Sequence, residues 1–181
     1  MDTESSSHHS HLEQQDFLRL VTGINREDAL CHERIANELP VIASLCELIF
    51  DRLSAGGRLF YLGAGTSGRL GIVDASECPP TYGVPFDKVI GLIAGGDGAI
   101  RKAVEFAEDD FEQGFRDLES YNIGQKDVVV GIAASGRTPY VIGALRQCRL
   151  EGIATGAIVC NKNSLMFNEC DICVEIETGP E

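Results

Sequence analysis

Short apolar runs that end in glycine or a polar turn recur along the chain after residue 57. They lie at 58–62, 89–94, 127–132, 157–160 and 172–176. Between them, helical spacing predicts two helices over 99–118 and one over 139–151. Strand, turn and helix in repetition are typical of a doubly wound sheet, and nearly continuous apolar strands indicate that both faces are covered. The pattern predicts an α/β fold with a mainly parallel, five-stranded sheet flanked by helices.

The first third of the chain shows helical spacing instead of strands. Residues 12–55 form the predicted N-terminal helical segment, in which Asn25 caps a second helix and Pro40 starts a third. Residues 1–11 are rich in Ser and His, and we expect a disordered tail there rather than a metal site. Residues 56–181 then form one α/β domain on which the N-terminal helices pack.

Composition and charge exclude several classes of protein. The 181 residues include no apolar run near the roughly 20 residues that span a bilayer, so we expect no membrane partner. Fifteen Lys and Arg against 28 Asp and Glu leave a net charge of -13, which repels a phosphate backbone and argues against nucleic-acid binding. An anionic ligand would need local backbone N–H groups to attract it.

The seven cysteines favour a reducing compartment. Their number is odd and no secretory signal precedes them, so we expect reduced thiols and a cytoplasmic location. Cys170 and Cys173 form a C-x-x-C, but it leads into a predicted strand and no second pair accompanies it. We interpret this pair as structural, and the sequence predicts no metal and no cofactor.

The first glycine loop matches the residue pattern of a dinucleotide-binding motif, but the rest of the sequence lacks the other features of such a site. Residues 63–68 read G-A-G-T-S-G after a predicted strand. A nicotinamide site also needs an acid at the end of the second strand, and only Asp97 follows, too late in the chain. Arg69 and Leu70 stand where a phosphate-binding P-loop has Lys and Ser or Thr, so that interpretation fails as well.

Hydroxyl groups point to a different ligand. The carboxyl ends of parallel strands meet at one edge of a sheet, and three loops are expected there: Gly63–Arg69, Gly95–Asp97 and Ala133–Thr138. Two of them carry hydroxyls at helix starts, and such a start binds phosphate through free N–H groups. The predicted phosphate-binding residues are Gly65, Thr66, Ser67, Ser135, Gly136 and Thr138. Alternatively, Ser135 only caps the helix that begins near Pro139.

Five segments together carry a resemblance to a known family. They are residues 61–71, 74–81, 91–96, 107–109 and 127–140. The two hydroxyl loops resemble those of sugar isomerase (SIS) domains, and the whole set is closer still to N-acetylmuramic acid 6-phosphate etherases. The resemblance runs from about Leu12 to Glu181. Members of that family continue further, so the chain resembles roughly their first three-fifths, which supports the family fold more strongly than the activity.

The resemblance implies a function in cell-wall sugar recycling. The family hydrolyses the ether of N-acetylmuramic acid 6-phosphate to N-acetylglucosamine 6-phosphate and D-lactate, without metal or nicotinamide. It implies Glu77 as general acid and Glu108 as the base at C2, and a homodimer with sites near the subunit interface. From the residues alone, the Pro79-Pro80 turn would hold Glu77 partly desolvated, whereas Glu108, in the acidic run 108–110, fits a solvated helix face better than a site. Arg69 and Arg137 would assist as charges or form surface salt bridges.

Two other functions fit the same loops. A non-catalytic phosphosugar sensor, similar to glucokinase regulatory proteins, keeps the hydroxyl loops without needing both carboxyl groups, and an inactive fragment would behave in the same way. An aldose–ketose isomerase shares proton removal at C2 but cleaves no ether. The presence of both Glu77 and Glu108 favours the etherase.

Overall fold

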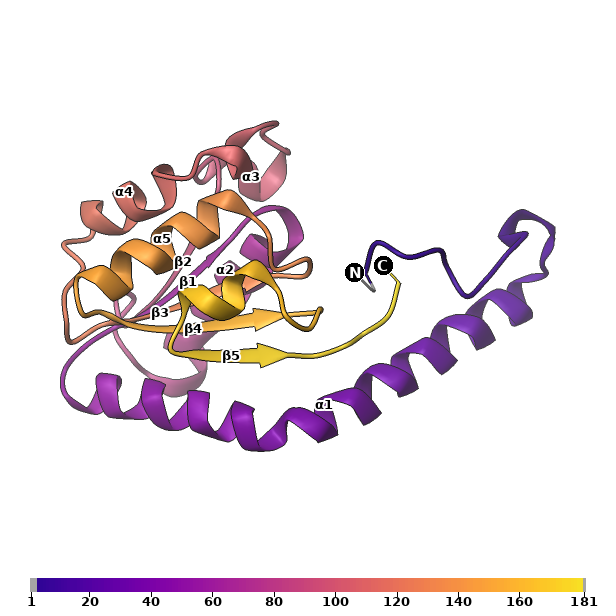
Figure 1. Ribbon diagram of the computed structural model, residues 1–181, viewed down its shortest axis with the longest axis horizontal. Coiled ribbons are helices and arrows are strands. Elements are labelled where there is room, and N and C mark those ends of the chain that lie inside the picture. The colour runs from indigo at the N-terminus through magenta and orange to yellow at the C-terminus, as the bar shows by residue number, and fades with distance from the viewer. Residues whose placement is uncertain (1–2, 181) are drawn as a thin grey trace.

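The computed structural model describes residues 3–180, which form a five-stranded parallel sheet between layers of helices (Figure 1). The strands are β1 Leu59–Gly63, β2 Val89–Ile93, β3 Val128–Ala133, β4 Ala154–Val159 and β5 Ile172–Glu175. Their order is β2-β1-β3-β4-β5, and every neighbouring pair is parallel. The predicted α/β fold with a five-stranded sheet is confirmed, although β4 begins three residues earlier than the sequence pattern indicated.

The helices cover both faces of the sheet. They are α1 Phe17–Ser54, α2 Gly65–Tyr82, α3 Gly98–Arg101, α4 Gln113–Ser120 and α5 Pro139–Leu150, with 3-10 turns η1 Leu12–Gln14, η2 Ala107–Asp109 and η3 Leu165–Glu169. Leu45 of α1 and Ala75 of α2 join Val128 and Val130 in one core. Val129 faces the opposite core with α4 and α5. Successive residues of β3 therefore serve different cores, which explains its unbroken apolar sequence.

The N-terminal helical segment is one helix rather than three. α1 has 38 residues and passes through both Asn25 and Pro40, where breaks were predicted. Pro40 has no N–H to donate to the preceding turn, and α1 bends part-way along its length (Figure 1). Ser44 Oγ donates to the Pro40 carbonyl at 3.1 Å. The break predicted at Pro40 is wrong because Val41, Ile42 and their neighbours pack on the sheet and hold the helix together across the proline, and the break predicted at Asn25 is wrong because α1 continues through this exposed residue.

The segments around β2 also differ from the sequence pattern. A turn was expected at Pro79-Pro80, but α2 has 18 residues and carries both prolines in its last turns. The stretch 99–118 was expected to be two helices. It contains the four-residue α3, the 3-10 turn η2 and the eight-residue α4, with a loop at 102–106. That loop lies beside the candidate site.

Residues 3–16 fold back beside the N-terminal half of α1, so that the first and the last described segments of the chain lie close together (Figure 1). Thr3 is buried there, and its backbone N–H donates to Asn161 Oδ1 at 3.3 Å. The disordered tail and the division into segments remain predictions. None of the described helices combines the length and the hydrophobicity that crossing a membrane requires.

Candidate functional site

The candidate site lies where the connections of the sheet change direction. β1 has β2 on one side and β3 on the other. The connection from β1 leads to β2 at one edge of the sheet, and the connection from β2 then crosses back to β3 on the other side of β1. Gly63 pairs with Ile93 of β2 and with Ile132 of β3, so the three strands end level with one another. The three loops that the sequence singled out therefore follow adjacent strand ends. Ligands of doubly wound sheets bind at this position.

The first hydroxyl loop is a sharp turn from β1 into α2. A Cβ at Gly68 would lie 2.6 Å from Ile93 Cγ1, so this glycine lets α2 lie against the sheet. The close packing of α2 on the sheet explains why the G-A-G-T-S-G loop ends in glycine, and no bound nucleotide is needed to explain it. Ala64 is the N-cap of α2 and supplies no capping side chain. The first N–H groups of α2, beside the hydroxyls of Thr66 and Ser67, thus have no acceptor within the helix.

The second hydroxyl loop connects β3 to α5. Gly136 has φ +67, and a Cβ there would lie 2.4 Å from Ser164 Cβ. The N-cap of α5 is Thr138, without a side-chain capping bond, and Ser135 Oγ accepts from Arg137 N at 3.3 Å. Ser135 is therefore not the cap of α5, and that alternative is wrong. The hydroxyls of Ser135 and Thr138 stand at a helix start that neither of them caps.

Tyr140 fixes the start of α5. Its ring is fully buried, and its hydroxyl donates to Asp117 Oδ2 at 2.7 Å. Burial, followed by the hydrogen bond to this carboxylate, raises the pKa of Tyr140, so the phenol stays protonated. The second hydroxyl loop therefore leads into a helix that is anchored to α4.

A cavity of about 230 Å³ opens beside the first hydroxyl loop. Ala64, Gly65 and Arg69 line it from the start of α2, and Glu108 lines it from η2. The Arg69 guanidinium donates from Nε to Ile100 O and from Nη2 to Ala99 O, both at 2.9 Å. Arg69 thus holds the end of α3 through neutral carbonyls and keeps its positive charge beside the cavity. The surface salt bridge considered for it is not what the structure contains.

The two predicted catalytic carboxyl groups are not together in one chain. Glu108 lies at the cavity, in the same turn as Asp109. Glu77 is exposed on α2, and the rise of about 1.5 Å per residue places it about 18 Å along the helix from Gly65. One hexose cannot bridge that distance. The desolvation of Glu77 by a Pro-Pro turn is also absent within the chain, because the prolines continue the helix.

Glu77 shares an uncovered face of α2 with apolar side chains. Leu70, Val73 and Glu77 follow one another at helical spacing, and Leu70 and Val73 are 60% and 58% exposed. Thr66, one turn before Leu70, begins the same face at the candidate phosphate site. The opposite face of α2 packs on the sheet through Gly71 and Ala75. An apolar strip therefore connects the first hydroxyl loop with Glu77 on the outside of the chain.

The sequence did not identify the loop 102–106 as part of the site. Val104 and Phe106 line the cavity from this loop, close to Glu108. Their spacing fits the helix that was expected over 99–118, and no glycine, proline or motif marks the loop. The left-handed backbone of Phe106, which places it there, leaves no trace in a single sequence.

Residues 41–149 match the family model for the glucokinase regulatory protein N-terminal SIS domain. A protein named N-acetylmuramic acid 6-phosphate etherase from Christiangramia forsetii is 52% identical over 180 residues. One of the same name from Yersinia pestis (strain Pestoides F) is 54% identical over 170 residues. The chain belongs to the N-acetylmuramic acid 6-phosphate etherase family of SIS-domain proteins. The resemblance deduced from the motifs is confirmed, and it covers 99% of the chain, including residues before Leu12.

The etherase-family chain is shorter than these relatives. It spans 66% of the Christiangramia forsetii protein and 58% of the Yersinia pestis protein. Among solved structures, phosphoheptose isomerase from Neisseria gonorrhoeae superposes with a TM-score of 0.66 at 17% identity, over 87% of this chain and 83% of that one. A phosphoheptose isomerase from Francisella tularensis gives 0.63 at 18% identity, over 86% and 85%. These structures support the SIS fold.

Proposed function

We propose that this chain forms the phosphosugar-binding core of an enzyme that cleaves the D-lactyl ether of N-acetylmuramic acid 6-phosphate. Water and this substrate give N-acetylglucosamine 6-phosphate and D-lactate. The observation that carries the proposal is that both hydroxyl loops follow adjacent strand ends, where the first of them and Glu108 line a cavity of about 230 Å³. Relatives at 50–54% identity that are named for this reaction support it. The reaction would take place in the cytoplasm, where the seven free thiols stay reduced.

The hydroxyl loops would bind the phosphate group. The N–H groups at the start of α2 and the hydroxyls of Thr66, Ser67, Ser135 and Thr138 are donors at adjacent strand ends. Gly65 is exposed and leaves the backbone accessible in the first turn, whereas Gly136 is buried, donates its N–H to the Ala133 carbonyl and shapes the second turn. Such donors attract a phosphate locally, through hydrogen bonds and the helix dipole, even on a chain with a net charge of -13. The sugar would then extend towards Glu108.

The chemistry needs one base and one acid. In the ring-opened substrate the C1 aldehyde acidifies the proton on C2, and the Glu108 carboxylate removes it. The electron pair forms the C2–C3 double bond as the C3–O bond breaks, and the lactate oxygen takes a proton from Glu77. Water then adds at C3 and gives a proton to Glu77, while Glu108 returns its proton to C2. Overall, one water is consumed for each ether cleaved, both glutamates return to their starting protonation states, and neither a metal nor a cofactor takes part.

A homodimer would complete the site. Because Glu77 lies about 18 Å from the start of its own α2, it can serve only a site in another chain. The exposed strip of Leu70 and Val73 is apolar enough to be covered by a second copy, and covering it would also desolvate Glu77. We infer that each cavity receives the acid from Glu77 of the partner subunit and the base from its own chain.

D-lactate release after mixing with the substrate tests the function directly. We expect release with the wild-type chain and none with Glu77→Gln, which should still bind the sugar phosphate within severalfold of the wild-type affinity. We expect deuterium from solvent at C2 of the product, and its loss in Glu108→Gln. Full activity in Glu77→Gln would remove this residue from the mechanism.

The sensor function is the second candidate. Residues 41–149 match a domain of glucokinase regulatory protein, and within one chain Glu77 is remote from the cavity. A sensor would show a rise in melting temperature with the sugar phosphate and no D-lactate. An isomerase would instead interconvert glucosamine 6-phosphate and fructose 6-phosphate, and turnover of these compounds would identify it.

A further inference from the structure

Phe106 combines three unusual features in the loop before Glu108. Its backbone has φ +62, in the left-handed region that residues other than glycine, asparagine and aspartate rarely adopt. Its side chain is 79% exposed. It lines the cavity of about 230 Å³ together with Gly65, Arg69 and Glu108. A large aromatic ring thus stands at the rim of the candidate site.

The fold itself gives no reason for a phenylalanine here. The exposed ring contributes little to either core, and the left-handed backbone would be less strained with glycine. The loop is nevertheless held in place. A Cβ at Gly95 would lie 2.8 Å from Val104 Cβ, so the loop packs directly on the end of β2. The Phe106 carbonyl accepts a hydrogen bond from the Asp109 N–H at 3.2 Å. This bond connects the backbone of Phe106 to the turn that carries Glu108.

The neighbours of the ring are small. Ala64, Ala94, Ala99 and Ala103 line the same cavity and leave apolar space without a bulky group. The charged groups at the cavity are Arg69 and the carboxylates of Glu105 and Glu108. Phe106 therefore offers an apolar surface beside the group that would act at C2. A ligand with an apolar substituent next to C2 would fit this arrangement.

We propose that Phe106 contacts the lactyl substituent of the bound sugar phosphate and thereby makes the site prefer the ether substrate over the product. This inference rests on the proposed function, in which Glu108 removes the proton at C2. C3, which carries the lactyl group, is the next carbon of the sugar. The lactyl methyl would pack against the ring, and this contact would remove apolar surface of both the methyl and the ring from water. The product has only a hydroxyl at C3 and would lack this contact.

Binding measurements with two ligands test the proposal. A Glu77→Gln background prevents consumption of the ether, and calorimetry gives the affinities of N-acetylmuramic acid 6-phosphate and N-acetylglucosamine 6-phosphate. We expect Phe106→Ala and Phe106→Gly to weaken binding of the ether about tenfold and of the product less than about twofold. Phe106→Leu, which keeps an apolar side chain, should lose less. Phe86→Ala removes an exposed ring that does not line this cavity and serves as the control.

The outcomes distinguish an effect of the Phe106 ring on binding from an effect of its backbone strain and from a failure of the proposed function. The glycine variant removes the strain, so its melting temperature should equal or exceed that of the wild type. If it binds the ether as tightly as the wild type, or if both ligands weaken in parallel, the proposal is wrong. If the wild-type chain binds both ligands but releases no D-lactate, the etherase function fails while the affinities still decide on Phe106. If it binds neither ligand, both proposals fall.

Discussion

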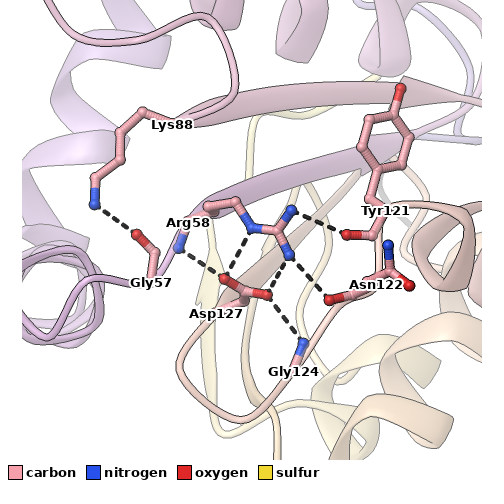
Figure 2. A network of polar contacts seen from close by, with 7 residues as sticks. All are labelled: Gly57, Arg58, Lys88, Tyr121, Asn122, Gly124 and Asp127. Atoms are coloured by element: carbon pink, nitrogen blue, oxygen red, sulfur yellow. Dashed lines mark hydrogen bonds and ion pairs between the residues drawn. The ribbon is translucent and has the colours of Figure 1, made fainter.

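Arg58 and Asp127 form a two-pronged ion pair at the amino edge of the sheet, opposite the candidate site (Figure 2). Arg58 Nη2 lies 2.8 Å from Asp127 Oδ2 and Nε lies 3.2 Å from Oδ1. The backbone N–H groups of Arg58 and Gly124 also donate to this carboxylate, at 2.8 and 3.0 Å. The guanidinium further donates to the carbonyls of Tyr121 and Asn122. The pair therefore ties the starts of β1 and β3 to the end of α4.

Replacing Asp127 should destabilise the chain in a pH-dependent way. Burial alone would raise the pKa of this carboxyl, but the hydrogen bonds and charge of Arg58 outweigh it, and the pKa is lowered below 3.8. The stabilisation is thus present above the unfolded value and is lost as the pH falls through the lower folded value. We expect Asp127→Ala to reduce the free energy of unfolding by about 3 kcal/mol at pH 7, because the guanidinium loses its partner.

Urea unfolding at pH 7 and at pH 2 measures this effect. The difference between Asp127→Ala and the wild type should shrink at the lower pH, because the stabilisation by the ionised carboxyl is lost as the pH falls towards its lowered pKa. Asp28→Ala, at an exposed position of α1, is the control and should change stability by less than about 0.5 kcal/mol. An equal loss at both pH values would mean that packing, rather than the ion pair, stabilises this edge.

Substituting Gly136 should disturb the second hydroxyl loop. Alanine would occupy φ +67 and place its Cβ 2.4 Å from Ser164 Cβ, so that the backbone must shift. We expect a loss of about 3 kcal/mol in the free energy of unfolding from left-handed strain and overpacking together. The affinity for a sugar phosphate should fall as well, since Ser135 and Thr138 flank the glycine. Gly124→Ala, where a Cβ meets nothing within 4 Å, is the matched control.

The sequence was sufficient to predict the parts of the site that depend on local pattern. Glycine and hydroxyl residues after apolar strands predicted where both hydroxyl loops lie, because strand ends and helix starts are determined within a few residues, whereas phosphate binding by these loops stays a prediction. The break predicted at Pro40 was wrong, because the continuity of α1 there depends on contacts with the sheet that a local pattern does not contain. The break predicted at Asn25 was wrong as well, because a single asparagine inside a helix costs less than about 1 kcal/mol and does not end it. Phe106 was missed for a related reason, since its left-handed turn depends on how Val104 packs on Gly95.

Removing hydroxyls from the phosphate loops should weaken binding without slowing the chemical step. Ser67 and Ser135 lie at adjacent strand ends, where they would bind the phosphate on C6 rather than the reacting carbons C2 and C3. Each hydrogen bond to a phosphate oxygen is charge-assisted, so we expect Ser67→Ala and Ser135→Ala each to raise KM about tenfold. The value of kcat should stay within about twofold, because phosphate contacts bind substrate and transition state alike. D-lactate release at varied substrate concentration gives both constants.

A serine outside the site provides the control for these variants. Ser44 Oγ donates only within α1, to the Pro40 carbonyl at 3.1 Å. Ser44→Ala should leave KM and kcat unchanged. A fall in kcat with constant KM for Ser67→Ala would instead place this hydroxyl at the reacting atoms, and the orientation of the sugar in the cavity would have to be reversed.

Mixing two inactive variants should restore activity if the acid comes from the second subunit. A Glu77→Gln chain keeps Glu108, and a Glu108→Gln chain keeps Glu77, so a mixed dimer has one site with both carboxyl groups and one with neither. Random pairing of equal amounts makes half of the dimers mixed, and about a quarter of the wild-type rate of D-lactate release is expected. Each variant alone should be inactive.

If the mixture is also inactive although mass spectrometry detects mixed dimers, the shared site is wrong, and Glu77 would have to act within its own chain. The distance of about 18 Å along α2 argues against that arrangement.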